Sequence, residues 1–349
     1  MSTARTATVR SAALRADFDV QHGGRMVSLL DVRNEHEWLV PPSATAPEAT
    51  YGSSFTQRHI HGWDEMLPTI DACTVLGVEL PDHGEIWAVP WQRRRASTTG
   101  GLRLSADSLA MPLRLVREVH PRGPDLVLDY QLFNLGAQPL PFLWAAHPQF
   151  RVSPDAQIHF STPVTKVAVV SPPERVGGTD WSGAVALAGQ LPRGDHLKLW
   201  LDCPPDHDNG VTLRDGGSAL SIHWDGRSIP QAAVLWDNAQ FSGERIVAIE
   251  PSTARHDSLA AAVAQGGLAM LAGGGSRRWT LTLSVPYPPG AWLYHAISHV
   301  PQPRSLLLTA SAENSRSTTS RVRPTTAASS PNDPSCRVMC RVALGSESR

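Results

Sequence analysis

The sequence from about residue 8 to residue 285 consists of short runs of alternating or β-branched apolar residues, which Gly, Pro, Asn and Asp interrupt at intervals of about eight to twelve residues. Because successive side chains of a strand point to opposite faces of a sheet, this pattern is typical of an antiparallel β-sandwich or barrel. The 29 prolines and 27 glycines are too many for a helical bundle, and no regular alternation of strands with helices indicates a parallel sheet. One short helix is expected within residues 257–274. The clearest predicted strands read RMVSLLDV, DLVLDYQLFN, HLKLWLDC, RIVAIEP and RRWTLTLSV.

Composition and charge limit the classes of partner. A chain of 349 residues is long enough for one large β domain or two ordinary domains. Apolar residues make up 41% and charged residues 18%, as in a globular protein, and the net charge is -1. A chain so close to neutral has no electrostatic reason to bind nucleic acid or an anionic membrane. This balance favours a small neutral ligand.

The cysteines and the apolar runs bear on disulfides, metal sites and cellular location. The four cysteines are scattered, and the two that lie close together sit in a polar segment, so we expect neither a disulfide framework nor a metal site. The first twenty residues contain no continuous apolar stretch, and no run of 18 apolar residues occurs. We therefore expect a cytoplasmic protein.

The composition changes near residue 300. Residues 301–349 are rich in Ser, Thr, Arg and Pro and nearly free of aromatic residues. Such a segment cannot bury enough apolar surface to offset the entropy lost on ordering. The predicted organisation is a β-sandwich domain over 8–300 and a disordered tail over 301–349, which is either functional or an out-of-frame translation.

Two histidines lie where predicted strands meet turns. His83 stands in LPDHGEIW and His147 in AAHPQF. They belong to a series of four local features in a fixed order: GGRMVSLLD, then HGWDEMLPTI with LPDHGEIWAVPW, then WAAHPQF, and last IVAIEPSTARHDS. In this order and spacing the features resemble the aldose 1-epimerase (galactose mutarotase-like) family over about residues 10 to 285.

The resemblance implies a large antiparallel β-sandwich whose concave face binds a sugar. It also implies roles for three residues: His147 is similar to the general acid of the family, Glu250 in AIEP to the general base, and His83 to a second active-site histidine. Histidines at strand ends would then present their rings to a cleft that a ligand can enter. A surface or structural histidine and an exposed strand-end carboxylate are the alternatives for these residues.

The residue types suit the chemistry that the resemblance implies. Interconversion of α and β anomers takes a proton from the C1 hydroxyl and gives one to the ring oxygen, so that the ring opens, turns about the C1–C2 bond and recloses on the other face. A carboxylate such as Glu250 can accept the first proton, and a histidine with a pKa near neutrality can donate the second. The resemblance therefore implies a reaction without a metal or organic cofactor. The setting of Glu250 after IVAI indicates a carboxylate at the end of a buried strand, where desolvation raises the pKa of a base.

Further residues near these motifs are candidates for sugar binding. Arg58, Asp64 and Asp237 can hydrogen-bond sugar hydroxyls, and Glu65 is a similar case. Trp91 is a candidate to stack on a sugar face. The tryptophans gathered around the motifs are equally suited to the core of a sandwich: Trp63, Trp87, Trp91, Trp144 and Trp236.

Two departures from the family pattern bear on the substrate. Sugar phosphate mutarotases of this superfamily place an aromatic residue and an arginine after the His-Gly pair, whereas Glu85, Ile86 and Trp87 follow it here. The expected ligand is therefore an unphosphorylated aldose. Gln149 replaces an aromatic residue after the His-Pro pair. The identity of the sugar and the oligomeric state stay open.

Two alternative functions remain. The series His59, His61 and Glu65 has the H-x-H-x3-E spacing of the first cupin motif, which would bind a divalent metal on a β-barrel. The second cupin half is not recognisable. A β-sandwich that binds carbohydrate without catalysis would also show a similar pattern.

Overall fold

The computed structural model describes residues 6–43, 49–203, 207–266, 268 and 270–286. The predicted boundary near residue 300 and the predicted tail over 301–349 lie outside the described residues, so both stay predictions. Within the described ranges neither helix has the length and the apolar composition that crossing a bilayer requires.

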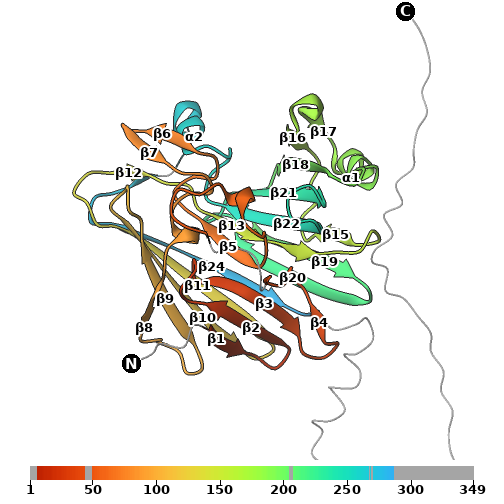
Figure 1. Cartoon of the computed structure of the whole chain (residues 1–349), viewed down its shortest axis with the longest axis horizontal. Helices are drawn as coiled ribbons and strands as arrows, with labels where there is room; N and C mark the ends of the chain where they lie inside the picture. Colours follow the sequence, from red (N-terminus) through yellow and green to blue (C-terminus); the bar gives the residue numbers. More distant parts are fainter. Residues whose placement is uncertain (1–5, 44–48, 204–206, 267, 269, 287–349) are drawn as a thin grey trace, which may run out of the picture. The chain divides into compact units, whose positions relative to one another are not determined.

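The described strands build two large antiparallel sheets (Figure 1). The first is 12-stranded, with β4 (His36–Glu37) pairing with β3 and β14 (Phe150–Arg151) pairing with β22 beside its main path. That path runs through β1 (Thr6–Arg10), β2 (Leu14–Asp19), β3 (Arg25–Asp31), β5 (Trp63–Met66), β13 (Ala145–Pro148), β22 (Arg245–Ser252), β21 (Gln231–Asn238), β18 (Asp195–Leu201), β16 (Val167–Ser171) and β17 (Gly177–Thr179).

The second sheet is 8-stranded. Its order is β15 (Gln157–Phe160), β19 (Asp208–Asp215), β20 (Ser218–Asp225), β24 (Ser276–Ser284), β11 (Asp125–Asn134), β10 (Leu113–Arg122), β9 (Leu102–Asp107) and β8 (Gln92–Arg94). Two small ribbons complete the strands: β6 (Cys73–Val75) with β7 (Val78–Leu80), and β12 (Leu140–Pro141) with β23 (Met270–Leu271).

Helices are few and short in the described part of the chain. The helix expected within residues 257–274 is present as α2 (Leu259–Gln265), and the Ser258 side chain caps it by accepting a hydrogen bond from Ala261 N. The other helix, α1 (Trp181–Gly189), was not predicted. The described residues also include single turns of 3₁₀ helix at η1 (Phe55–Gln57), η2 (Ile86–Ala88) and η3 (Pro173–Arg175).

Alternation along the strands produces the core. In β24 the side chains of Trp279, Leu281 and Leu283 are buried, whereas their immediate neighbours are exposed or half-buried. Leu281 lies opposite Leu128 of β11. One hydrophobic cluster contains these leucines of the second sheet together with Leu14 and Leu199 of the first, so the two sheets pack face to face. The prediction of a large antiparallel β-sandwich is confirmed.

The centre of the first sheet carries buried charge. Glu65 of β5 is fully buried, and its carboxylate accepts hydrogen bonds from Arg117, Tyr130 and Trp144 at 2.7, 2.9 and 2.9 Å. These donors come from β10 and β11 of the second sheet and from the segment before β13. Because a buried carboxylate needs such partners, the network fixes β5 against the second sheet.

Candidate active site

A cavity of about 290 Å³ lies over four neighbouring strands of the first sheet, β13, β22, β21 and β18. It is lined by His147, Glu250 and Lys198 from these strands and by His83 and Phe55 from the loops beside them. The sheet order therefore brings together residues that are far apart in the sequence. All three catalytic candidates, His83, His147 and Glu250, line this one cavity.

His147 lies inside β13 rather than at its end, and it is buried, with 4% of its surface exposed. The Gln149 amide nitrogen is 3.2 Å from the ring Nε2, and Nδ1 has no hydrogen-bond partner in the described structure. Burial, together with the nearby His83, Lys198 and Arg58, holds the pKa of His147 well below its ordinary value. The expectation of a pKa near neutrality is not met, because the ring is desolvated and lies near the Lys198 and Arg58 cations.

Glu250 lies in β22 opposite Ala233 of β21, and it has no exposed surface. Its Oε1 atom is 3.7 Å from His147 Nε2. Neither carboxylate oxygen has a hydrogen-bond partner among the described residues. Burial raises the pKa of Glu250 to about 7, although the attraction of Lys198 opposes the rise. The carboxyl group is thus poised to gain or lose a proton near neutral pH.

Lys198 and Asp257, neither of which was a candidate from the sequence, also carry charge at the cavity. Lys198 Nζ is 3.3 Å from Glu250 Oε2 and 2.8 Å from Asp257 Oδ1, so it bridges the two carboxylates. Burial alone would lower the pKa of Lys198, but the charges of Asp257 and Glu250 raise it above its ordinary value. The lysine therefore stays cationic and favours ionisation of Glu250.

The sequence contains a weak indication that Lys198 is a functional residue. It is one of only two lysines in a chain that otherwise uses arginine, and it stands within the apolar strand HLKLWL. Its contact with Glu250 spans β21, which lies between β18 and β22, so only the sheet order reveals it. His196, on the same strand, also lines the cavity, where its Nε2 atom is 2.7 Å from the Ser171 hydroxyl.

His83 reaches the cavity from a tight turn after β7. Its backbone φ is 59°, and Gly84 follows with a φ of 74°, at a place where an added Cβ would lie 2.2 Å from the Leu67 carbonyl oxygen. Trp87 Nε1 donates to the carbonyl oxygens of Asp82 and Gly84, which closes the turn. Glycine at position 84 is therefore required to hold His83 in place.

The His83 ring is fixed on two sides. Asp82 Oδ1 is 2.7 Å from its Nδ1 atom, and the ring stacks on Phe55 with 4.0 Å between centroids and 7° between planes. The centroid of the His147 ring is 5.0 Å from that of His83. The carboxylate at Nδ1 and the stacked Phe55 ring together fix the orientation of the His83 imidazole at the cavity.

Arg58 and Asp64 form a buried ion-pair cluster beside the cavity rather than lining it. Asp64 pairs with His147 in the β5–β13 register, but its two oxygens accept hydrogen bonds from Arg25 and Arg58. Burial alone would raise the pKa of Asp64, but the two arginines lower it below its ordinary value. The placement of Asp64 thus gives no support to its predicted contact with sugar hydroxyls, because both oxygens are already engaged. The Arg58 guanidinium lies over the Phe55 ring, 4.2 Å from its centroid.

Trp91 does not line the cavity, and neither do the other tryptophans near the motifs. Trp91 is buried in the core, donates to the Ile86 carbonyl oxygen and lies under the Arg117 guanidinium. Its predicted stacking on a sugar is therefore not supported, because its ring faces are covered by protein. The aromatic residues that do line the cavity are Phe55 and Phe241.

Asp237 lines the cavity, but its carboxylate already accepts hydrogen bonds. The donors are the backbone N–H groups of Gln240, Phe241 and Ser242, in the turn that joins β21 to β22. Asp237 therefore fixes this turn and places Phe241 at the cavity. Its predicted contact with sugar hydroxyls stays a prediction.

The cupin alternative does not assemble. His59 and His61 lie near each other, but Glu65 of the same motif points into the core, where Arg117 binds it. Burial lowers the pKa of His61 to about 4, and its Nε2 atom is 3.2 Å from Arg25. In the described part of the chain no group of His, Cys, Asp and Glu side chains is arranged to hold a metal.

Comparisons with known proteins agree with this architecture. No family model matches the chain, and no curated protein sequence matches it either. Among solved structures, the Slr1438 protein of Synechocystis sp. PCC 6803 is similar at a TM-score of 0.61 and 16% identity, over 81% of this chain and 96% of that one. A galactose mutarotase-like protein of Lactobacillus casei is similar at 0.59 and 15%, over 80% and 100% of the two chains.

A third structure is a protein of Escherichia coli K12 that is provisionally named an aldose 1-epimerase. Its TM-score is 0.59 at 16% identity, and the match covers 81% of this chain and 99% of that one. At these identities the likeness concerns the fold. The chain has a galactose mutarotase-like fold.

Proposed function

We propose that this protein is a carbohydrate-binding isomerase, an aldose 1-epimerase that interconverts the α and β anomers of an unphosphorylated aldose. One observation carries the proposal: the Glu250 carboxyl and the His147 imidazole are both buried, stand 3.7 Å apart and line the same cavity. Two such groups at one ligand site supply the proton donor and the proton acceptor that ring opening requires. The fold and the His83 ring beside them agree with this role.

The reaction requires Glu250 and His147 to hold one proton between them. Glu250 as a carboxylate accepts the proton of the C1 hydroxyl, and protonated His147 donates to the ring oxygen. Both transfers reverse when the ring closes on the other face. Because the two groups are in contact, they titrate as a coupled pair, and the form with its proton on Glu250 is the one that recloses the ring: Glu250 returns a proton to the C1 oxygen while His147 takes the proton of the hydroxyl that attacks C1. The low pKa of His147 and the pKa of about 7 of Glu250 favour this singly protonated pair in weakly acidic solution.

Lys198 acts on the pair without being a proton carrier. Its ammonium group is ion-paired with Glu250 and Asp257, and its raised pKa keeps it charged. The positive charge prevents burial from raising the pKa of Glu250 further. We regard Lys198 as a positioning residue that sets the pH range in which Glu250 exchanges its proton.

The charges at the cavity favour a sugar without a phosphate group. No arginine is among the residues that line it, and Lys198 is already paired with two carboxylates. Asp71 adds a further carboxylate, whose pKa burial and the charge of Asp257 raise. The volume of about 290 Å³ is at the lower end of the range for ligand sites, which suits a monosaccharide.

Polarimetry tests the proposal. Freshly dissolved α-glucose, α-galactose and further hexoses and pentoses are followed with and without the protein, beside the corresponding sugar phosphates. We expect at least one unphosphorylated aldose to approach its anomeric equilibrium faster than in buffer. Binding of a sugar without any acceleration would instead support the alternative of a non-catalytic carbohydrate-binding protein.

A further inference from the structure

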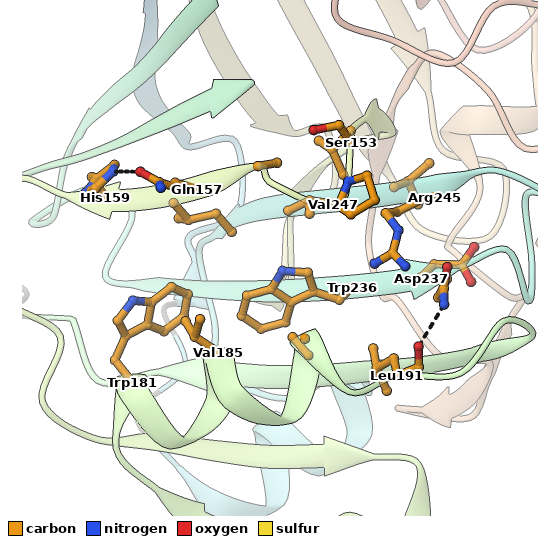
Figure 2. A pocket seen from close by; sticks show the side chains of 18 of the residues that line it. Ser153, Gln157, His159, Trp181, Val185, Leu191, Trp236, Asp237, Arg245 and Val247 are labelled. Carbon is orange, nitrogen blue, oxygen red and sulfur yellow. Dashed lines mark hydrogen bonds between the residues drawn. The ribbon is translucent and has the colours of Figure 1, made fainter. Parts of the chain in front are cut away.

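Figure 2 shows a second cavity, of about 480 Å³, which shares strands β21 and β22 with the candidate active site. It is lined by residues of α1, β15, β21 and β22. In β21, Leu235 faces the candidate active site and the next residue, Trp236, faces this second cavity, as strand alternation requires. Asp237 and Ile246 border both cavities. None of the catalytic candidates lines the second one.

Two tryptophans form one wall of the second cavity. The rings of Trp181 and Trp236 are 5.5 Å apart between centroids and tilted by 32°, and both are half-buried. Trp181 is the first residue of α1, and Asp180 caps this helix by accepting a hydrogen bond from Gly183 N at 2.7 Å. The Trp181 ring also packs edge-on against Phe160 of β15. Contacts from both sheets thus hold the two indole rings beside open space.

Arg245 supplies a positive charge to the same cavity. Figure 2 shows its side chain extending into the cavity beyond Trp236. In the described structure no carboxylate forms an ion pair with this guanidinium, whereas Arg25 and Arg58 of the same sheet region are both paired with Asp64. A half-buried guanidinium without a protein partner is suited to bind a carboxylate through two parallel hydrogen bonds.

The other residues that line this cavity favour a flat aromatic ligand over a sugar. Val185, Leu191 and Val247 are apolar, and the His159 and Gln157 side chains lie 3.2 Å apart, within hydrogen-bonding distance of each other. The Ser153 and Ser182 hydroxyls and the Asn238 amide also line the cavity, but they donate to Asp215, Asp180 and the Leu191 carbonyl oxygen. Few side chains are therefore left to bind the hydroxyl groups of a sugar ring. Indole faces and aliphatic side chains instead favour a planar apolar ring.

We propose that this cavity binds a small aromatic carboxylate, with its ring against Trp181 and Trp236 and its carboxylate on Arg245. A volume of about 480 Å³ accommodates such a ligand. The inference does not depend on the proposed isomerase function, because it concerns another face of the sheet and other residues.

Isothermal titration calorimetry with phenylacetate and its neutral counterpart phenylacetamide tests the proposal. We expect the full-length protein to bind phenylacetate more tightly than phenylacetamide. Arg245→Gln should weaken phenylacetate binding by about tenfold or more and leave phenylacetamide binding nearly unchanged, because only the carboxylate uses the guanidinium. Trp181→Leu should weaken both ligands. Arg227→Gln is the matched control, since Arg227 is exposed and paired with Asp225.

Three results would overturn the proposal. The first is no measurable binding of phenylacetate to the wild-type protein. The second is binding that Arg245→Gln leaves unchanged. The third is binding that Glu250→Gln abolishes, because the ligand would then occupy the other cavity. If glucuronate binds in an Arg245-dependent manner and phenylacetate does not, the site recognises the anion but the aromatic class is wrong.

Discussion

Replacing Glu250 by Gln should make the protein more stable at alkaline pH while it removes the proposed activity. In the wild type the buried carboxyl has a pKa of about 7, against an ordinary value of 4.5. The folded state therefore binds this proton more tightly than the unfolded state does, and the wild-type protein loses stability as pH rises from about 4.5 to about 7. A shift of this size corresponds to about 3 kcal/mol in the free energy of unfolding.

Glutamine has the shape of the protonated carboxyl but cannot ionise. The free energies of unfolding of Glu250→Gln and wild type should agree within about 1 kcal/mol at about pH 5, and the variant should be more stable by about 3 kcal/mol at about pH 8. Urea unfolding at both pH values measures this difference in the free energy of unfolding. The contributions of titrating groups that the two proteins share cancel in the difference.

Glu118→Gln provides the matched control. The Glu118 carboxylate is buried but accepts hydrogen bonds from Ser97 N, Ser97 Oγ and Thr98 N. Burial alone would raise its pKa, but these bonds lower it below its ordinary value. Removing this charge should destabilise the protein at both pH values. If Glu250→Gln also destabilises the protein at about pH 8, the Lys198 ion pair outweighs the cost of burial and the reasoning on Glu250 fails.

Four further predictions concern the proposed reaction and the tail. His147→Asn should lower kcat by about 10²-fold or more and His83→Asn by less, which steady-state anomerisation kinetics would show; near-wild-type turnover of His147→Asn would reject its role. In wild type, kcat/KM should fall as pH rises through about 7, because the pair then loses its only proton; a rise through this range would show that ionised Glu250 acts with a proton from another group. Lys198→Met should move this fall to higher pH, because loss of the cation raises the pKa of Glu250; an unchanged profile would contradict the positioning role. A chain that ends near Val300 should keep its Tm within about two degrees, as calorimetry would show, if the segment beyond contributes few buried contacts; a large drop would contradict the predicted boundary.

The strands were predictable because their signal is local. Alternation over a few residues sufficed for Arg25–Asp31, Arg245–Ser252 and Ser276–Ser284. Helix α1 was missed because its sequence, WSGAVALAG, contains two glycines and no clear apolar stripe. It is helical because Asp180 caps it and because Ala184 and Ala188 are buried in the core of the fold. Tertiary packing decided that element.

The candidate site was only partly predictable. Glu250 and His147 were selected because each lies in a short motif, and both line the cavity. Lys198 was missed because its contact with Glu250 depends on the order of strands in the sheet. Trp91 was misplaced for a related reason: nearness to a motif along the chain does not tell whether a ring faces the cavity or the core.

The most direct test of the central claim is the rate of exchange between the two anomers of an aldose at equilibrium, measured by magnetisation-transfer NMR with wild type and with Glu250→Gln at equal concentration. The account predicts that wild type accelerates exchange for at least one unphosphorylated aldose and that the variant, although folded, lowers this acceleration by about 10²-fold or more. Equal exchange rates with wild type, with Glu250→Gln and in buffer, for every aldose tried, would contradict it.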